Sequence, residues 1–175
     1  MDARRIRFDR GFDLVFSSSV LHWVDDHPAF LRGAAAALKP DGRLHVSCGG
    51  KGNAQDVFLA LRPELRHQRW SKFFRKLETP YFFHTPGDYQ KWLPQFGFAS
   101  RHIGLAPKDA VYDGPEKFAA WFRTTWLPYT QRVPEALREE FIAAVTARFV
   151  ARHPPDGAGQ FHVRMVRLEI DAVRI

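Results

Sequence analysis

The sequence has few cysteines and no long apolar run, and each of these absences argues against a class of protein. Its 175 residues include a single cysteine, Cys48, so no disulfide can form within the chain. No apolar run approaches the roughly 20 residues that span a bilayer, and residues 1–5 lack the apolar stretch of a signal peptide. These shortages favour a cytoplasmic protein without a membrane segment.

Metal-binding and nucleophilic motifs are missing as well. The eight histidines are spread along the chain, and neither H-x-x-x-H nor H-E-x-x-H occurs, so no metal site is expected. A serine hydrolase would use a G-x-S-x-G turn, which is also absent. Cys48 ends a short apolar segment, and we interpret it as an inert core thiol.

What the chain does have is apolar and basic. Apolar residues make up 45% and aromatic residues 14%, enough for one packed domain over residues 1–175. The net charge of +7 raises the hypothesis of a nucleic-acid partner. The arginines are scattered along the chain instead of clustering. Nucleic acid is therefore not the favoured partner, and an RNA-binding or RNA-modifying protein stays an alternative.

The order of the predicted elements indicates an α/β fold with a parallel strand pair. Residues 12–17 are apolar on both sides and read as a short buried strand. A helix follows, with Asp26 as its cap and Pro28 in its first turn. A tight turn at 40–42 leads to a second strand over 43–48. Strand, helix and strand joined by short turns are typical of a βαβ unit.

The remaining pattern predicts helices and two further strands, with no clear domain boundary. The basic-aromatic residues 62–76 favour an amphipathic helix that buries its aromatic side chains over an RNA-binding surface. Residues 161–174 alternate between apolar and charged, which predicts a final, antiparallel strand. Between these lie expected helices at 53–61, from Thr85, from Pro115 and from Pro134, with a strand over 98–112.

Two segments carry a resemblance to a known family. The first is Phe12-Asp13-Leu14-Val15-Phe16-Ser17-Ser18-Ser19-Val20-Leu21-His22-Trp23, followed by Leu38-Lys39-Pro40-Asp41-Gly42-Arg43-Leu44. It resembles the fourth strand, following helix and fifth strand of class I S-adenosylmethionine-dependent methyltransferases. The Leu-His-Trp turn is similar to trans-aconitate methyltransferases and to the malonyl-carrier-protein methyltransferases of biotin synthesis. The second segment, from Trp121 through Leu168, resembles the helical insertion and last strand of the trans-aconitate-like group.

The resemblance implies a fold and a partner. The expected fold is a partial Rossmann-like methyltransferase sheet, strands four to seven, with helices. A helical insertion over 114–160 would cover the active-site side and precede the last, antiparallel strand. The implied cofactor is S-adenosylmethionine, and the implied partner is a small-molecule acceptor.

The resemblance also assigns candidate site residues. In open parallel sheets, ligands bind beyond the carboxyl ends of the strands, where small serines allow close approach. The implied cofactor contacts are Asp2, Ala3, Ser17, Ser18, Leu21 and Trp23, with Asp2 accepting a hydrogen bond from the adenine amino group. The candidate substrate contacts are His22, Asn53, Arg123, Trp126 and Tyr129, among which Arg123 is suited to clamp a carboxylate.

No catalytic base stands out, which favours a carboxylate acceptor because a carboxylate is already ionised at pH 7. His22 is the candidate catalytic base if the acceptor is a hydroxyl or an amine. The sequence therefore predicts methyl transfer to a carboxylate or another oxygen of a small molecule.

Residues 1–175 do not contain the glycine-rich cofactor loop of the family or the acid that ends its second strand. The run Gly49-Gly50-Lys51-Gly52 does not match a phosphate loop. The resemblance implies that Met1 occupies an internal position of the family fold, so we expect the isolated chain to be inactive. Strand 12–16 would then be an exposed apolar edge that promotes self-association. A non-catalytic remnant that pairs with another chain is the second alternative.

Overall fold

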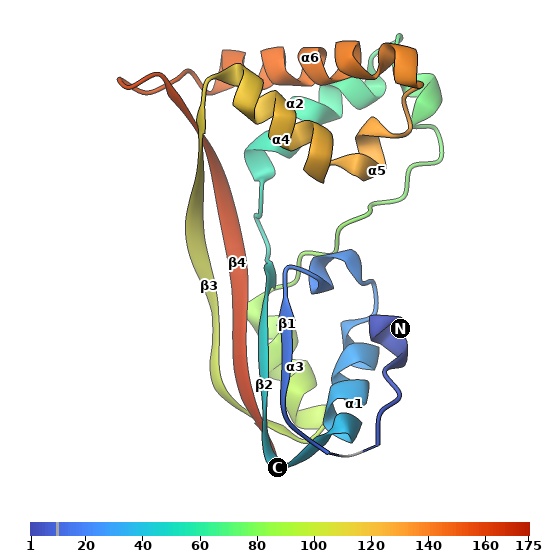
Figure 1. Ribbon diagram of the computed structural model, residues 1–175, viewed down its shortest axis with the longest axis vertical. Helices are drawn as coiled ribbons and strands as arrows, with labels where there is room; N and C mark the ends of the chain where they lie inside the picture. Colours follow the sequence, from blue (N-terminus) through green and yellow to red (C-terminus); the bar gives the residue numbers. More distant parts are fainter. Residues whose placement is uncertain (10) are drawn as a thin grey trace. The chain divides into compact units, whose positions relative to one another are not determined.

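The computed structural model describes residues 1–9 and 11–175, and it shows a mixed α/β chain (Figure 1). The predicted α/β class is confirmed. In chain order, with η for a short 3-10 helix, the elements are η1 (Ala3–Arg5), β1 (Phe12–Ser18), η2 (Leu21–Trp23), α1 (His27–Ala37), β2 (Leu38–Gly49), α2 (Gln55–Arg66), η3 (Ser71–Phe73), α3 (Pro86–Gln95), β3 (Phe98–Asp113), α4 (Pro115–Thr125), α5 (Leu127–Thr130), α6 (Glu135–Arg152) and β4 (Gln160–Arg174).

The strands form a sheet of order β1-β2-β4-β3. Strand β1 runs parallel to β2, with Val15 opposite Leu44, and α1 connects the two. Strand β4 runs antiparallel to β2, with Val46 opposite Ile170. The predicted βαβ unit and the antiparallel last strand are therefore both confirmed.

Internal contacts divide the chain into two compact units. The first contains residues 1–53, 80–108 and 166–175, and the second contains 54–79 and 109–165. The predicted insertion over 114–160 falls within the second unit. The prediction that 1–175 is one domain stays a prediction.

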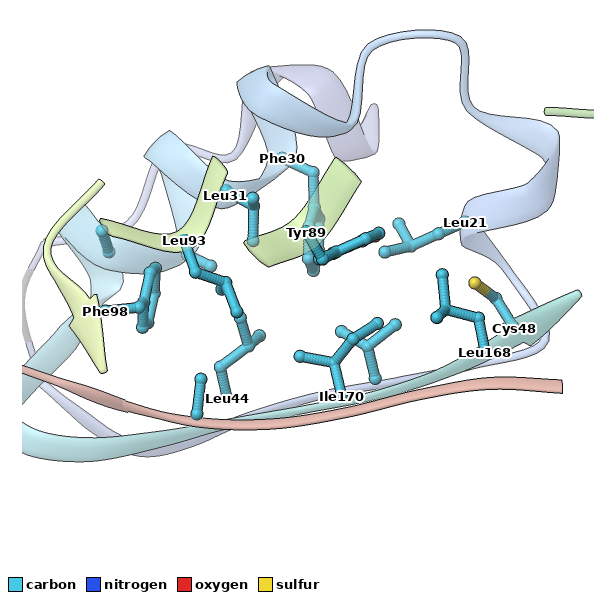
Figure 2. Close-up of a cluster of buried hydrophobic side chains, with 14 of the residues drawn as sticks. Leu21, Phe30, Leu31, Leu44, Cys48, Tyr89, Leu93, Phe98, Leu168 and Ile170 are labelled. Carbon is cyan, nitrogen blue, oxygen red and sulfur yellow. The ribbon is translucent and has the colours of Figure 1, made fainter. Parts of the chain in front are cut away.

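The core of the first unit lies between helices α1 and α3 and the inner face of the sheet (Figure 2). Leu31, Tyr89 and Leu93 of the helices meet Leu44 and Ile170 of the strands, and all five are at most 1% exposed. Full burial of each such side chain stabilises the fold by about 1.5–3 kcal/mol. Helices α1 and α3 therefore determine which face of the sheet is buried in the core.

The caps of α1 and α3 follow their sequence signals. The carboxylate of Asp26 accepts a hydrogen bond from the Ala29 amide (2.8 Å), as the predicted cap requires. Thr85 and Asp88 form a reciprocal capping box at the start of α3. Both helices therefore begin where local sequence chemistry satisfies their free amides.

The prediction that strand 12–17 is buried was wrong for one of its faces. Phe12, Leu14 and Phe16 are 44%, 53% and 63% exposed. Alternate residues of a strand point to opposite faces, and only the face of Val15 and Ser17 turns toward the helical layer. Because β1 ends the sheet order, the expected exposed apolar edge is present.

The second unit is built around α6. Phe141, Val145 and Phe149 recur every four residues along α6 and are fully buried. Helices α2 and α4 pack against α6 (Figure 1), and the Phe118 ring of α4 stacks on Phe149 at 4.2 Å between centroids. Among the described residues, no helix has the length and hydropathy needed to cross a bilayer.

We expect Leu168→Ala to lower the free energy of unfolding by about 2–5 kcal/mol, because it leaves a cavity in the core of the first unit. The matched change Leu105→Ala, at a side chain that is 41% exposed, should cost less than about 1 kcal/mol. Urea unfolding followed by circular dichroism measures both. Equal losses for the two variants would contradict the assigned core.

Candidate functional site

The candidate site begins where the parallel strands β1 and β2 end together. Ser17 and Ser18 pair with Val46 and Ser47, so both carboxyl ends reach one edge. The Ser19 amide then donates a 2.7 Å hydrogen bond to the Ser47 carbonyl. This edge is where ligands bind in open parallel sheets. Ser17 is buried, whereas Ser18 is exposed.

The turn η2 carries the Leu-His-Trp motif directly after β1. Leu21 is fully buried and fixes the turn to the core. The backbone amide of Gly49 donates to Nδ1 of His22 at 3.2 Å, so the hydrogen of the neutral ring lies on Nε2. Burial lowers the pKa of His22, which makes the ring neutral at pH 7. His22 therefore presents a hydrogen-bond donor at Nε2 and not a positive charge.

Aromatic rings gather beside His22. The Tyr81 ring lies 4.6 Å from Trp23 and stacks on Phe83 at 5.6 Å, measured between centroids. The Phe82 amide donates to the His22 carbonyl at 2.9 Å, which fixes this segment to the turn. The sequence did not indicate Tyr81 and Phe83 as site residues, because they lie about 60 residues after the motif and belong to no motif of their own.

The buried side chains of His27 and Tyr89 form a hydrogen-bonded pair that fixes the turn η2 to the core. His27 Nε2 lies 2.8 Å from the Leu21 carbonyl, and Nδ1 lies 2.6 Å from the Tyr89 hydroxyl. A carbonyl can only accept, so Nε2 carries the hydrogen and Tyr89 donates to Nδ1. Burial, with a contribution from His84, lowers the pKa of His27 to about 4. The sequence identified His27 only as part of a helix start.

Asp2 and Ala3 lie at the start of the first unit. Asp2 caps η1 and pairs with Arg4, whose guanidinium also contacts Asp25 at 3.0 Å. Hydrogen bonds from Arg4 lower the pKa of Asp2 to about 2, so this carboxylate is ionised. Ala3 packs against the edge of the core. The Asp2 carboxylate can thus accept a further hydrogen bond, in addition to those that it accepts from Arg4.

The glycine run after β2 is closely packed. A Cβ atom added at Gly49 would lie 2.8 Å from Phe83 and 2.9 Å from the Asn53 side chain. The side-chain oxygen of Asn53 accepts a hydrogen bond from the Val166 amide at 2.9 Å. These glycines permit a close approach of side chains to the end of β2.

Three candidate substrate contacts lie in the second unit. Arg123 makes a two-point ion pair with Glu139. Trp126 and Tyr129 are 3% and 4% exposed and contact each other in the core of that unit. The structure thus places eight candidates in the first unit, and Arg123, Trp126 and Tyr129 in the second. The assigned roles of all of them stay predictions.

Histidine, cysteine and acidic side chains are the groups that a metal site or a reactive thiol would need. Within residues 1–9 and 11–175, no three histidine, cysteine or acidic side chains gather in a metal-binding arrangement. Cys48 is 2% exposed, and burial raises the pKa of its thiol to about 12. The predicted core position of Cys48 is confirmed, and the inertness of its thiol stays a prediction.

Comparisons with known proteins find similarity to methyltransferases, as the sequence motifs predicted. A profile of a methyltransferase domain family matches residues 1–46. Trans-aconitate 2-methyltransferases of Rhodopseudomonas palustris and Agrobacterium fabrum are 27% and 29% identical to the chain, over 94% and 93% of it. By sequence, this chain is similar to class I methyltransferases.

Solved structures of methyltransferases share the fold of this chain. Loganic acid methyltransferase matches 99% of the chain with a TM-score of 0.72 at 12% identity, and the chain covers 65% of that structure. A Bacillus halodurans structure described as a methyltransferase matches with a TM-score of 0.57 at 16% identity, with coverage of 99% and 69%. The chain spans 64% and 63% of the length of the two trans-aconitate methyltransferases.

From the low pKa of His27, we predict how the free energy of unfolding changes with pH. The unfolded histidine has a pKa near 6.5 and the folded one about 4, so the unfolded state binds the extra proton between these values. Stability is thus fully present above pH 6.5 and is lost as the pH falls toward 4, by on the order of 3 kcal/mol. Urea unfolding at pH 4.5 and 7.5 should show a smaller pH effect in His27→Gln than in the wild-type chain. An unchanged effect in the variant would contradict this assignment.

Proposed function

We propose that the protein transfers a methyl group from S-adenosylmethionine to a carboxylate of a small molecule. The observation that carries the proposal is the neutral His22 beside the half-exposed Trp23, directly after β1 in a chain similar to methyltransferases. Relatives support the acceptor class by name, because they include a malonyl-[acyl-carrier protein] O-methyltransferase and a juvenile hormone acid O-methyltransferase.

The residues present fit the cofactor in two respects. The exposed, ionised Asp2 offers a carboxylate that can accept a hydrogen bond from an adenine amino group. Ser17 and Ser18 end β1 with small side chains, and the proposed cofactor contacts continue through Leu21 and Trp23. When bound, S-adenosylmethionine supplies an electrophilic methyl group. Ala3 would pack beside it.

The chain itself binds and orients the acceptor in this proposal. His22 donates from Nε2 to one oxygen of the acceptor carboxylate, and no proton has to be removed from that group. The rings of Trp23, Tyr81 and Phe83 exclude water around it. Asn53 offers its amide nitrogen, since its oxygen is engaged by Val166.

Arg123 stays a proposed acceptor anchor on one condition. Its guanidinium is paired with Glu139, so it would bind an acceptor carboxylate only by exchanging that partner. Trp126 and Tyr129 would then act through their packing around the Arg123 helix.

Calorimetric titration with S-adenosylhomocysteine tests the proposal, followed by transfer of a labelled methyl group to a panel of carboxylic acids. The proposed methyl transfer predicts binding and base-labile methyl esters, with Trp23→Ala weakening both by about tenfold and the exposed control Val111→Ala changing neither. The inactivity expected of residues 1–175 alone, from the missing glycine-rich loop, predicts neither binding nor esters. A folded chain that neither binds nor esterifies would favour a non-catalytic role.

The exposed edge of the sheet supports a second candidate function, which is pairing with another chain. Phe12, Leu14 and Phe16 present apolar surface at the end of the strand order. Parallel strand pairs are ordinarily covered on both faces, and edge strands with free amides pair readily with further strands. We propose that two copies of the protein associate through β1.

Sedimentation velocity at about 1–100 µM tests this association at concentrations typical for weak dimers. The wild-type chain should sediment faster as concentration rises, whereas Leu14→Lys/Phe16→Lys should stay monomeric because an edge lysine opposes pairing. Val111→Lys, at an exposed residue of β3, should behave as the wild type. A wild-type chain that is monomeric throughout would contradict the proposed edge.

A further inference from the structure

The net charge of the chain is concentrated in one short stretch, residues 62–76, which we call the basic segment. It contains six basic residues and one acidic residue, Glu64. The rest of the chain then holds 20 basic residues against 18 acidic ones, from totals of 26 and 19. The basic segment therefore accounts for +5 of the net charge of +7.

The positive side chains of the basic segment face solvent, and its acid does not. All six are exposed: Arg62, Arg66, Arg69, Lys72, Arg75 and Lys76. Glu64 is 5% exposed and pairs with Arg148 of α6. Of the segment's cations, Arg69 forms an ion pair with Glu140. The exposed positive charge of the basic segment is therefore largely uncompensated.

The basic segment is held on a fixed scaffold. Trp70 and Phe74 are 2% and 8% exposed, and their rings contact Phe141 at 5.5 and 5.4 Å. Arg62 and Arg66 lie four residues apart on α2, so they share one face of that helix. The cations therefore project from an ordered surface, unlike those of a disordered basic tail.

We propose that the basic segment docks an acidic surface of a partner protein. Arginines outnumber lysines four to two in the segment, and arginine is the cation that protein interfaces favour. Leu65 and Phe73 lie half-buried between the cations, and the half-buried Leu77 directly follows them. These three side chains offer the apolar contact that a protein partner uses. This inference is independent of the proposed methyl transfer, because none of the residues proposed for that reaction belongs to the basic segment.

The same features argue against a nucleic acid or a lipid surface as the binding partner of the basic segment. Single-stranded nucleic acids stack their bases on exposed aromatic rings, whereas Trp70 and Phe74 point into the core of the second unit. An amphipathic membrane helix inserts a strongly exposed apolar face, and the apolar residues of the segment are at least half covered.

Fluorescence anisotropy with two labelled peptides of equal negative charge tests the docking surface. One peptide places leucines between its glutamates, and the other places serines there. At low salt, we expect the leucine peptide to bind about tenfold more tightly than the serine peptide. Binding should weaken with added salt, because surface charges are screened.

Matched charge reversals locate the surface. Arg66→Glu/Lys72→Glu/Arg75→Glu should weaken binding of the leucine peptide by about tenfold or more. The control R101E/K117E/R132E reaches the same net charge at exposed sites elsewhere and should weaken it by less than about threefold. Circular dichroism confirms that both variants fold.

Three outcomes would overturn the proposal. Equal losses in the two triple variants would show an effect of net charge alone. Tighter binding of a 20-nucleotide RNA duplex, lost only in the first variant, would assign the segment to nucleic acid. Tighter binding to vesicles containing phosphatidylserine, lost in the same way, would assign it to a lipid surface.

Discussion

The hydrogen-bonded chain from Tyr89 through His27 to the Leu21 carbonyl ties together three separate parts of the first unit. It joins helix α3, the start of α1 and the turn after β1. A buried imidazole without both partners would leave polar atoms unsatisfied, at a cost of about 1–3 kcal/mol each. The position of His22 and Trp23 at the strand ends depends on this connection, because Leu21 is the residue from which the turn leaves the core.

Burial on one face of the sheet gives the strand β1 two roles. Its inner residues, Val15 and Ser17, face the helices and lead into the candidate site. Its outer residues keep apolar surface in solvent. The same alternation of a pleated strand therefore produces the ordered strand end that the proposed catalysis needs and the edge that the proposed association uses.

Ion pairs explain why the second unit has an uncompensated basic surface. Its acids are largely engaged within the unit: Asp56 binds Arg164 through both oxygens, and Glu64 binds Arg148. Glu139 and Glu140 bind Arg123 and Arg69. Apart from Glu140, which pairs with Arg69, these acids do not neutralise the exposed arginines of residues 62–76. The distribution of charge, more than its total, distinguishes this unit.

The sequence by itself determined the α/β class and the caps of α1 and α3, and it carries the resemblance to methyltransferases, because each depends on neighbouring residues or on a local motif. It did not predict that Phe12, Leu14 and Phe16 are exposed, since hydropathy does not say whether a second layer covers a strand. It also missed Tyr81, Phe83 and Tyr89. Only the tertiary structure brings these three side chains to the turn after β1, because contacts between residues about 60 positions apart depend on how the helices pack on the sheet.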